Sequence, residues 1–217
     1  MTDEQALKFT NDVFYLIRRA VSVSDLEAIP IEFDGLIENS LNNASYPKIQ
    51  FSINSEEIQS LIENNSISED LSLDKNISSK LSDPLTKLLY AMAWKNGDLI
   101  KLKHIIKGIL DINSINIEQD EALVFYQFGK YLTKTGQPII DQHVIRAFAI
   151  YDSGNADQTR IFRKISSVNK THKEIIILYK KWLASDELTL ELRSEIDYRY
   201  YIDKLLFATG KAIKSYN

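Results

Sequence analysis

The sequence predicts a mainly α-helical protein built from packed helix pairs. Apolar residues recur at spacings of three and four in one segment after another, which is the periodicity of an amphipathic helix. Capping residues stand before several of these segments, and the connections between them are short. Amphipathic helices with short connections favour helix-on-helix packing over a parallel sheet.

An amphipathic helix is expected over residues 3–23, at the start of the chain. Its apolar face is formed by Ala6, Phe9, Val13, Leu16, Ile17 and Ala20, which recur at helical spacing. Pro30 and Gly35 then interrupt regular structure.

A strand is expected over residues 45–53, where apolar and polar residues alternate. The alternating apolar residues are Ile49, Phe51 and Ile53. Ser55 follows as the expected N-cap of a short helix that ends near Ile62.

A polar segment over residues 63–83 separates two predicted parts of the chain. It is rich in Asn, Ser, Asp and Glu, which predicts a polar loop or linker between an acidic helical part over 1–62 and a basic helical part over 84–217. Residues 1–83 carry 6 Lys and Arg against 15 Asp and Glu, a net charge of −9, whereas 84–217 carry 20 against 15, a net of +5. The basic part can meet phosphates, although ordinary solvated helix faces would give the same moderate excess.

The second part predicts a series of capped helices. Asp83 caps a helix that begins at Pro84 and ends at Asn96 and Gly97. One face of this helix is formed by Leu85, Leu88, Leu89, Met92 and Ala93. Asp98 caps the next helix. Further helices are expected over residues 118–132, from 141 onward, 156–165, 173–184 and 185–211.

Composition excludes several classes of site and of protein. The chain has no cysteine, which excludes disulfides, cysteine-ligated zinc and cysteine-ligated iron–sulfur clusters. Its three histidines are scattered without the spacing of metal ligands, so we expect no metal and no cofactor. The acidic N-terminus does not resemble a signal peptide, and no apolar run approaches the roughly 20 residues of a membrane span. The expectation is a soluble, cytoplasmic protein with no membrane partner.

The most informative motif runs from Gly136 to Arg146 and reads Gly-Gln-Pro-Ile-Ile-Asp-Gln-His-Val-Ile-Arg. It places Asp141 after a turn and at the start of a helix, where its carboxylate accepts free backbone N–H groups. These bonds and the helix dipole favour the ionised carboxyl. A carboxylate held in this way can stabilise positive charge that develops in a substrate, although most capping aspartates only cap.

The pattern Asp-x-His-Val-x-Arg after Gly-x-Pro resembles the run around the catalytic aspartate of the helix-hairpin-helix DNA glycosylase superfamily. The resemblance covers mainly residues 118–150 and implies an orthogonal multi-helix fold. It implies that Asp141 is the essential carboxylate and that Gln142 lies at the substrate. Arg146 matches the family's arginine, which orients the helix or meets the DNA backbone. His143 is expected to make a structural hydrogen bond.

Two departures from the family shape the expected chemistry. The family's hairpin has a glycine-rich turn that grips a DNA phosphate, but no glycine stands between Gly108 and Gly129. Bifunctional members place a lysine upstream of the aspartate, at a position that Leu123 occupies here. The resemblance therefore implies a monofunctional glycosylase acting on a base flipped from the duplex. Asp141 would stabilise an oxocarbenium-like sugar and activate water.

Duplex DNA with a modified base is the expected partner. Trp94 and Tyr126 are candidates to stack on the flipped base, beside Phe125 and Trp182, although each suits a helical core equally. The candidates for phosphate contacts are Lys103, Lys107, Lys130, Lys134, Arg160, Arg163 and Lys164. The alternatives are a non-catalytic helical module that binds DNA or a protein, and an unrelated helical domain in which the motif arose by chance.

Overall fold

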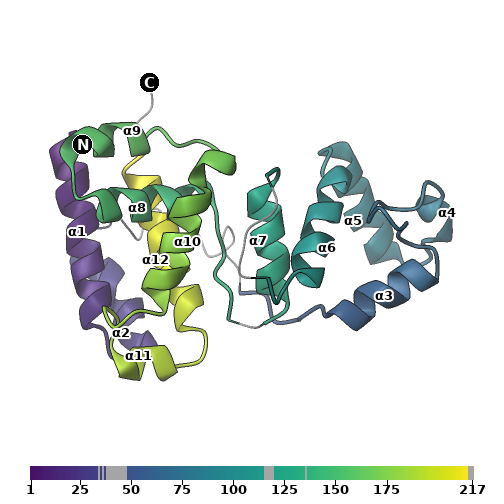
Figure 1. The fold of residues 1–217 in the computed structure, drawn as a ribbon, viewed down its shortest axis with the longest axis horizontal. Helices are drawn as coiled ribbons and strands as arrows, with labels where there is room; N and C mark the ends of the chain where they lie inside the picture. Colours follow the sequence, from purple (N-terminus) through teal and green to yellow (C-terminus); the bar gives the residue numbers. More distant parts are fainter. Residues whose placement is uncertain (34, 36, 38–47, 115–119, 135, 215–217) are drawn as a thin grey trace. The chain divides into compact units, whose positions relative to one another are not determined.

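The computed structural model describes residues 1–33, 35, 37, 48–114, 120–134 and 136–214. These residues fold mainly into α-helices, as the sequence predicts (Figure 1). Within the described ranges there is no named strand, and one antiparallel bridge joins Ile67 and Leu73. None of the helices in this described part is both long and apolar enough to span a lipid bilayer.

The chain divides into two compact units. Unit 1 comprises Met1–Ile49 and Gly136–Asn217, and unit 2 comprises Gln50–Thr135. Unit 1 is therefore discontinuous in sequence, and unit 2 is the stretch between its halves. The polar segment 63–83, which we expected to separate the parts, lies within unit 2.

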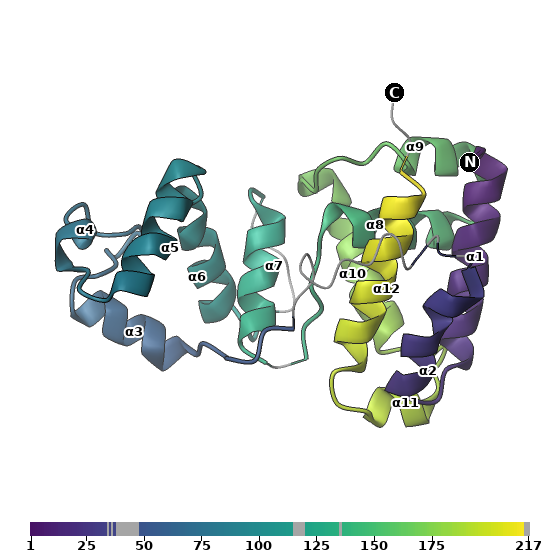
Figure 2. The same cartoon turned by 180° about the vertical axis from the view of Figure 1, so that it is seen from behind.

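Unit 1 is built around one central helix, α8 (Gln142–Ser153), which follows directly after Asp141. Every residue from 144 to 150 is buried, so α8 is enclosed by other helices. It packs on α12 (Tyr198–Ala212) and α1 (Asp3–Arg19), as Figure 2 shows from behind. The other elements of the unit are α2 (Val23–Ala28), η1 (Ile29–Phe33), α9 (Ala156–Phe162), η4 (Lys170–His172), α10 (Lys173–Leu183) and α11 (Leu190–Ser194).

An aromatic cluster fills the core of unit 1 between α1, α8 and α10. Phe14 stacks on Tyr151 with ring centroids 3.9 Å apart, and Trp182 lies 5.0 Å from Phe14. Phe148 and Tyr179 complete the cluster at a centroid distance of 5.1 Å. Burial of large aromatic rings is a major source of stability, so this cluster anchors α8.

Unit 2 contains a tightly packed helix pair. Its elements are α3 (Ser55–Glu63), α4 (Ile77–Lys80), α5 (Pro84–Lys95), η3 (Leu99–Lys101), α6 (Leu102–Leu110) and α7 (Leu123–Leu132). Helices α6 and α7 cross where Gly108 meets Gly129. A Cβ atom at Gly129 would lie 2.0 Å from the carbonyl oxygen of Ile105, and one at Gly108 would lie 2.0 Å from that of Tyr126. The two backbones therefore approach closely only because neither residue has a side chain.

Replacing Gly129 with alanine is expected to destabilise the protein by about 3 kcal/mol, because an added methyl group would force the α6 and α7 backbones apart. The higher helix propensity of alanine offsets only about 1 kcal/mol of this loss in unfolding free energy. Gly97→Ala is the control. Gly97 has φ +70° but open space around it, so the alanine should lower the unfolding free energy by about 1 kcal/mol, through the left-handed backbone conformation alone. Denaturant unfolding measures both variants, and equal losses would contradict the packing argument.

Several element predictions are confirmed. The N-terminal helix forms as α1, and Asp83 caps α5 by accepting the Thr86 N–H at 2.7 Å. Helix α5 ends at Asn96 and Gly97, and α8 begins after Asp141. These elements share a capping side chain at the start, and α5 and α8 also have an Asn or Gly at the end.

The strand predicted over residues 45–53 is wrong in its described part, 48–53, and residues 45–47 lie outside the described ranges. Ile53 donates its N–H to the Leu132 carbonyl at 3.0 Å, but no ladder forms. The helix predicted over 118–132 begins only at Leu123, after Ala122 takes the left-handed conformation, and 118–119 lie outside the description.

The single helix predicted over residues 185–211 is two helices, α11 and α12. Between them Asp197 adopts φ +66°, a left-handed conformation that no α-helix accommodates. The buried residues Leu192 and Tyr198 on either side of the break are six residues apart, and the exposed Ile196 lies between them, so the helical period is interrupted here.

Candidate functional site

Asp141 is held at the N-terminus of α8 by one of its two carboxylate oxygens. Oδ1 accepts the N–H groups of His143 at 2.7 Å and Val144 at 2.8 Å. Oδ2 makes no hydrogen bond with any described residue, and the side chain is only partly buried. One oxygen is thus fixed by the helix while the other is available to a ligand.

Burial raises the pKa of the Asp141 carboxyl above its ordinary value. The backbone hydrogen bonds from Val144 and His143 and the charge of Arg146 lower this pKa, but they only partly offset the desolvation. The capping hydrogen bonds do favour the ionised form, as expected from the sequence, but burial has the larger effect and the net pKa is raised. A raised pKa makes the carboxylate a stronger proton acceptor.

A second carboxyl group, Asp203 on α12, supports the segment that leads to Asp141. Asp203 is fully buried, and its oxygens accept the Tyr179 hydroxyl at 2.5 Å and the Ile139 N–H at 2.6 Å. Burial and the nearby Asp141 raise the pKa of Asp203 well above its usual range. Sequence reasoning missed Asp203, although an aspartate within the apolar run of α12 was an available signal.

Arg146 is fully buried and links α8 to neighbouring segments by hydrogen bonds. Nη1 donates to the Gly210 carbonyl at 2.5 Å and Nη2 donates to the Ile165 carbonyl. Nη1 also lies 2.8 Å from Nδ1 of His143, so the expected structural hydrogen bond of His143 is present. Of the two roles that the family resemblance gives Arg146, this geometry fits helix orientation, and a buried guanidinium does not reach a DNA backbone.

His143 is expected to stay neutral well below pH 6.5. Burial and the Arg146 charge lower its pKa to about 4. Between pH 6.5 and 4 the unfolded chain therefore binds a proton that the folded chain does not, so this residue makes stability fall as the pH falls through that window. An NMR titration of the ring should give a midpoint near pH 4, and His143→Gln should flatten the pH dependence of unfolding. A midpoint near 6.5 would contradict this environment.

Two residues proposed for base or DNA contacts, Tyr126 and Lys130, make contacts inside the protein instead. Tyr126 is buried, with its hydroxyl 3.3 Å from Asp111. Lys130 is buried and donates to the Ser114 carbonyl at 2.8 Å. These predictions are corrected because the side chains satisfy internal acceptors, which helical spacing alone cannot reveal.

Arg163 likewise makes its ion pair and hydrogen bonds inside unit 1. It forms an ion pair with Asp3 at 2.6 Å and donates to the carbonyls of Met1 at 2.9 Å and Ile213 at 2.7 Å. The guanidinium links the C-terminal end of α9 to the start of α1. The predicted phosphate contact of Arg163 is therefore also corrected.

The other predicted contact residues are not deeply buried. Gln142, Arg160 and Lys164 belong to unit 1 with Asp141, and Arg160 and Lys164 are exposed at the end of α9. The residues in unit 2 are Trp94, Lys103, Lys107 and Lys134. Trp94 is 67% exposed, and Lys134 lies over the Tyr131 ring at 4.8 Å.

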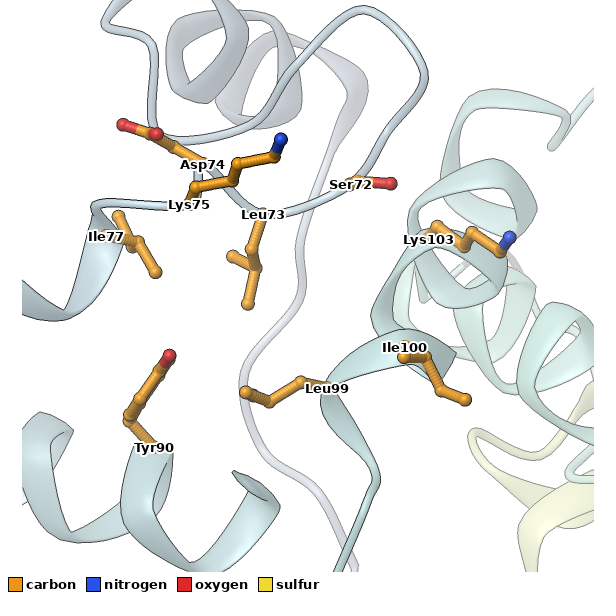
Figure 3. A pocket seen from close by; sticks show the side chains of 9 residues that line it. All are labelled: Ser72, Leu73, Asp74, Lys75, Ile77, Tyr90, Leu99, Ile100 and Lys103. Carbon is orange, nitrogen blue, oxygen red and sulfur yellow. The ribbon is translucent and has the colours of Figure 1, made fainter.

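A cavity of about 290 Å³ lies in unit 2, away from the predicted site residues except Lys103. Leu73, Leu99 and the hydroxyl of Tyr90 point into it, whereas Lys103 points away from its centre (Figure 3). Within the described residues, no His, Asp and Glu side chains gather in a group able to hold a metal ion.

Comparison with protein-family models, with curated proteins and with solved structures gave no match. The resemblance to DNA glycosylases therefore rests on the sequence motif from Gly136 to Arg146 alone.

Proposed function

We propose that the chain is a monofunctional DNA N-glycosylase in which Asp141 is the catalytic carboxylate. The observation that carries this proposal is the asymmetric binding of that carboxylate. Oδ1 is anchored by two backbone N–H groups at the start of an enclosed helix, and Oδ2 makes no hydrogen bond with the residues that the structure describes. An anchored but available carboxylate is the arrangement that electrostatic stabilisation of a cation requires.

In the proposed reaction a modified nucleotide leaves the duplex and enters the site. The bond between C1′ and the base nitrogen breaks, and the base departs with the electron pair while the sugar gains oxocarbenium character. Asp141 stabilises this cation and accepts a proton from the water that adds to C1′. Asp141 returns this proton to solvent and the released base takes one up from solvent, so the products are the neutral base and an abasic sugar, and the DNA strand stays intact.

Two buried groups act as positioning residues for Asp141. Arg146 fixes the first turns of α8 to Gly210, and Asp203 holds the Ile139 N–H two residues before the catalytic carboxylate. The exposed cations Arg160, on α9, and Lys164, just after it, suit contacts with phosphates.

The experiment is a base-excision assay of the purified protein on duplexes that carry alkylated, deaminated or oxidised bases. Alkali after the reaction cleaves abasic sites, so strand breaks that need alkali are the expected product of a monofunctional enzyme. Breaks without alkali would contradict this class of glycosylase. An absence of abasic sites on every duplex would contradict the proposed activity.

A second candidate is a non-catalytic helical module that binds DNA or a protein. It is favoured by the burial of Tyr126, a predicted stacking partner of the flipped base, whose hydroxyl lies 3.3 Å from Asp111 inside the protein. Tight, salt-dependent DNA binding without base release would support this module over the enzyme.

A further inference from the structure

Two buried arginines join the end of α12 to the segment that follows α9. Arg146 donates to the carbonyl of Gly210 at 2.5 Å and to the carbonyl of Ile165. Arg163 donates to the carbonyl of Ile213 at 2.7 Å. The segment after α9 and the end of α12 are therefore neighbours in space, and Figures 1 and 2 both show the end of α12 beside α9.

Three lysines gather where these two segments meet. Lys164 lies between the two residues of its segment that take part in these bonds, and Lys211 and Lys214 directly follow the two bonded residues of α12. The bonded residues are buried, whereas Lys164 and Lys211 are exposed and Lys214 is half-buried. Neither Lys164 nor Lys211 forms an ion pair with a residue that the structure describes. The fold thus fixes the backbone of these lysines and leaves two of the ammonium groups in solvent.

These lysines lie beside the first turn of α8, where Asp141 is held. Gly210 packs so closely on the backbone of His143 that a Cβ atom at Gly210 would lie 2.0 Å from the His143 carbonyl oxygen. The rings of Phe207 and His143 meet edge to face at 5.0 Å. Lys211 follows Phe207 by four residues and therefore shares the face of α12 that meets α8. His143 in turn donates its backbone N–H to Asp141 at 2.7 Å.

Electrostatics give the same placement of the lysines. Burial and the charge of Arg146 lower the pKa of His143 the most, and the charges of Lys214 and Lys211 lower it further. The described side chains whose charges shift this pKa are all cations. The negative charge of Asp141 would repel a DNA phosphate, so a strand that brings its sugar to Asp141 requires cations close by.

We propose that Lys164, Lys211 and Lys214 form a lysine rim that binds the backbone phosphates of duplex DNA beside Asp141. This inference rests on the proposed function, because it takes Asp141 as the carboxylate that faces the sugar of the target nucleotide. That sugar is joined to a phosphate on each side, so a sugar at Asp141 brings both phosphates near the rim. Sequence reasoning named Lys164 as a phosphate contact but neither Lys211 nor Lys214, because their position beside α8 depends on the tertiary fold.

Fluorescence anisotropy of a labelled duplex with one tetrahydrofuran abasic analogue tests the rim, because this position has no base to release. The wild type should bind with an affinity that falls as the KCl concentration rises. Each lost phosphate contact lowers the slope of log Kd against log salt by about 1. Lys211→Gln should therefore lower this slope by about 1, and the double variant Lys211→Gln with Lys214→Gln by about 2. At about 50 mM KCl the double variant should bind about tenfold more weakly.

Arg19→Gln is the matched control for the loss of one exposed positive charge. Arg19 is exposed and belongs to unit 1, but it lies at the opposite end of α1 from Asp3, which pairs with Arg163 next to the rim. The two ends of α1 are about 24 Å apart. Arg19→Gln should keep the wild-type slope, and Lys211→Arg should keep it as well because the charge remains. A double variant with the wild-type slope, or an equal loss in Arg19→Gln, would overturn the rim.

Base release from a modified duplex separates the rim from the proposed activity. Lys211→Gln should raise the protein concentration that gives half-maximal single-turnover release. A wild type that releases no base, with salt-dependent binding that weakens in the rim variants, would support the rim and contradict the enzyme. A wild type that releases bases, with rim variants that bind and react as it does, would support the enzyme and overturn the rim. A wild type that does not bind the duplex would overturn both.

Discussion

Replacement of Asp141 by asparagine is expected to lower the rate of base release about 10²–10⁴-fold, the range typical for loss of a general acid–base group. Asparagine can accept the same two N–H bonds and is an equally good N-cap, so the fold should persist. It carries no negative charge for the sugar cation and takes no proton from water. Single-turnover formation of alkali-labile sites, with a thermal melt of both proteins, measures the effect.

Asp83→Asn provides the matched control for this variant. Asp83 caps α5 as Asp141 caps α8, accepting the Thr86 N–H at 2.7 Å, but it lies outside the proposed site. It should release bases at the wild-type rate. Full activity of Asp141→Asn would show that the carboxylate is not the catalytic group, even if the wild type proves to be a glycosylase.

Replacement of Arg146 by methionine is expected to cost about 3 kcal/mol or more of unfolding free energy, the largest loss of stability that we predict. Methionine fills similar space but leaves the buried carbonyls of Gly210 and Ile165 without their donor. Each unsatisfied buried acceptor costs about 1–3 kcal/mol. Arg146→Lys should be intermediate, because an ammonium group lacks the planar fork that reaches two acceptors.

Denaturant unfolding at equilibrium measures the Arg146 variants. Arg160→Met is the control, because Arg160 is exposed on α9 and such a change should stay within about 0.5 kcal/mol. If Arg146→Met lost no more stability than Arg160→Met, the buried hydrogen bonds would not anchor α8.

Local signals in the sequence predicted the starts of α5 and α8, whereas the predicted cap Asp98 makes no capping hydrogen bond and α6 begins only at Leu102. Asp83 and Asp141 both cap as expected, because an N-cap acts through bonds to residues two and three positions away. The strand prediction failed because alternation describes exposure of a segment but supplies no partner strand. The helix break at Asp197 depends on one residue in the left-handed conformation.

The candidate site was predictable only in part. The position of Asp141 followed from its motif, whereas the support from Asp203 depends on contacts between residues 64 positions apart. Burial of Lys130 and Arg163 was not predictable either, since their acceptors are backbone carbonyls supplied by the tertiary fold. Charge counts along the chain therefore overstated the basic surface.

The discontinuity of unit 1 has a consequence for synthesis on the ribosome. Helix α1 emerges early, but its partners α8, α9 and α12 follow only after the whole of unit 2. Because the ribosome adds about 5–20 residues per second, the apolar face of α1 remains without its packing partners for several seconds. Unit 2 can meanwhile complete its helix pair. The nascent chain should therefore fold from the middle outward, and a chaperone that binds apolar segments should meet α1 first.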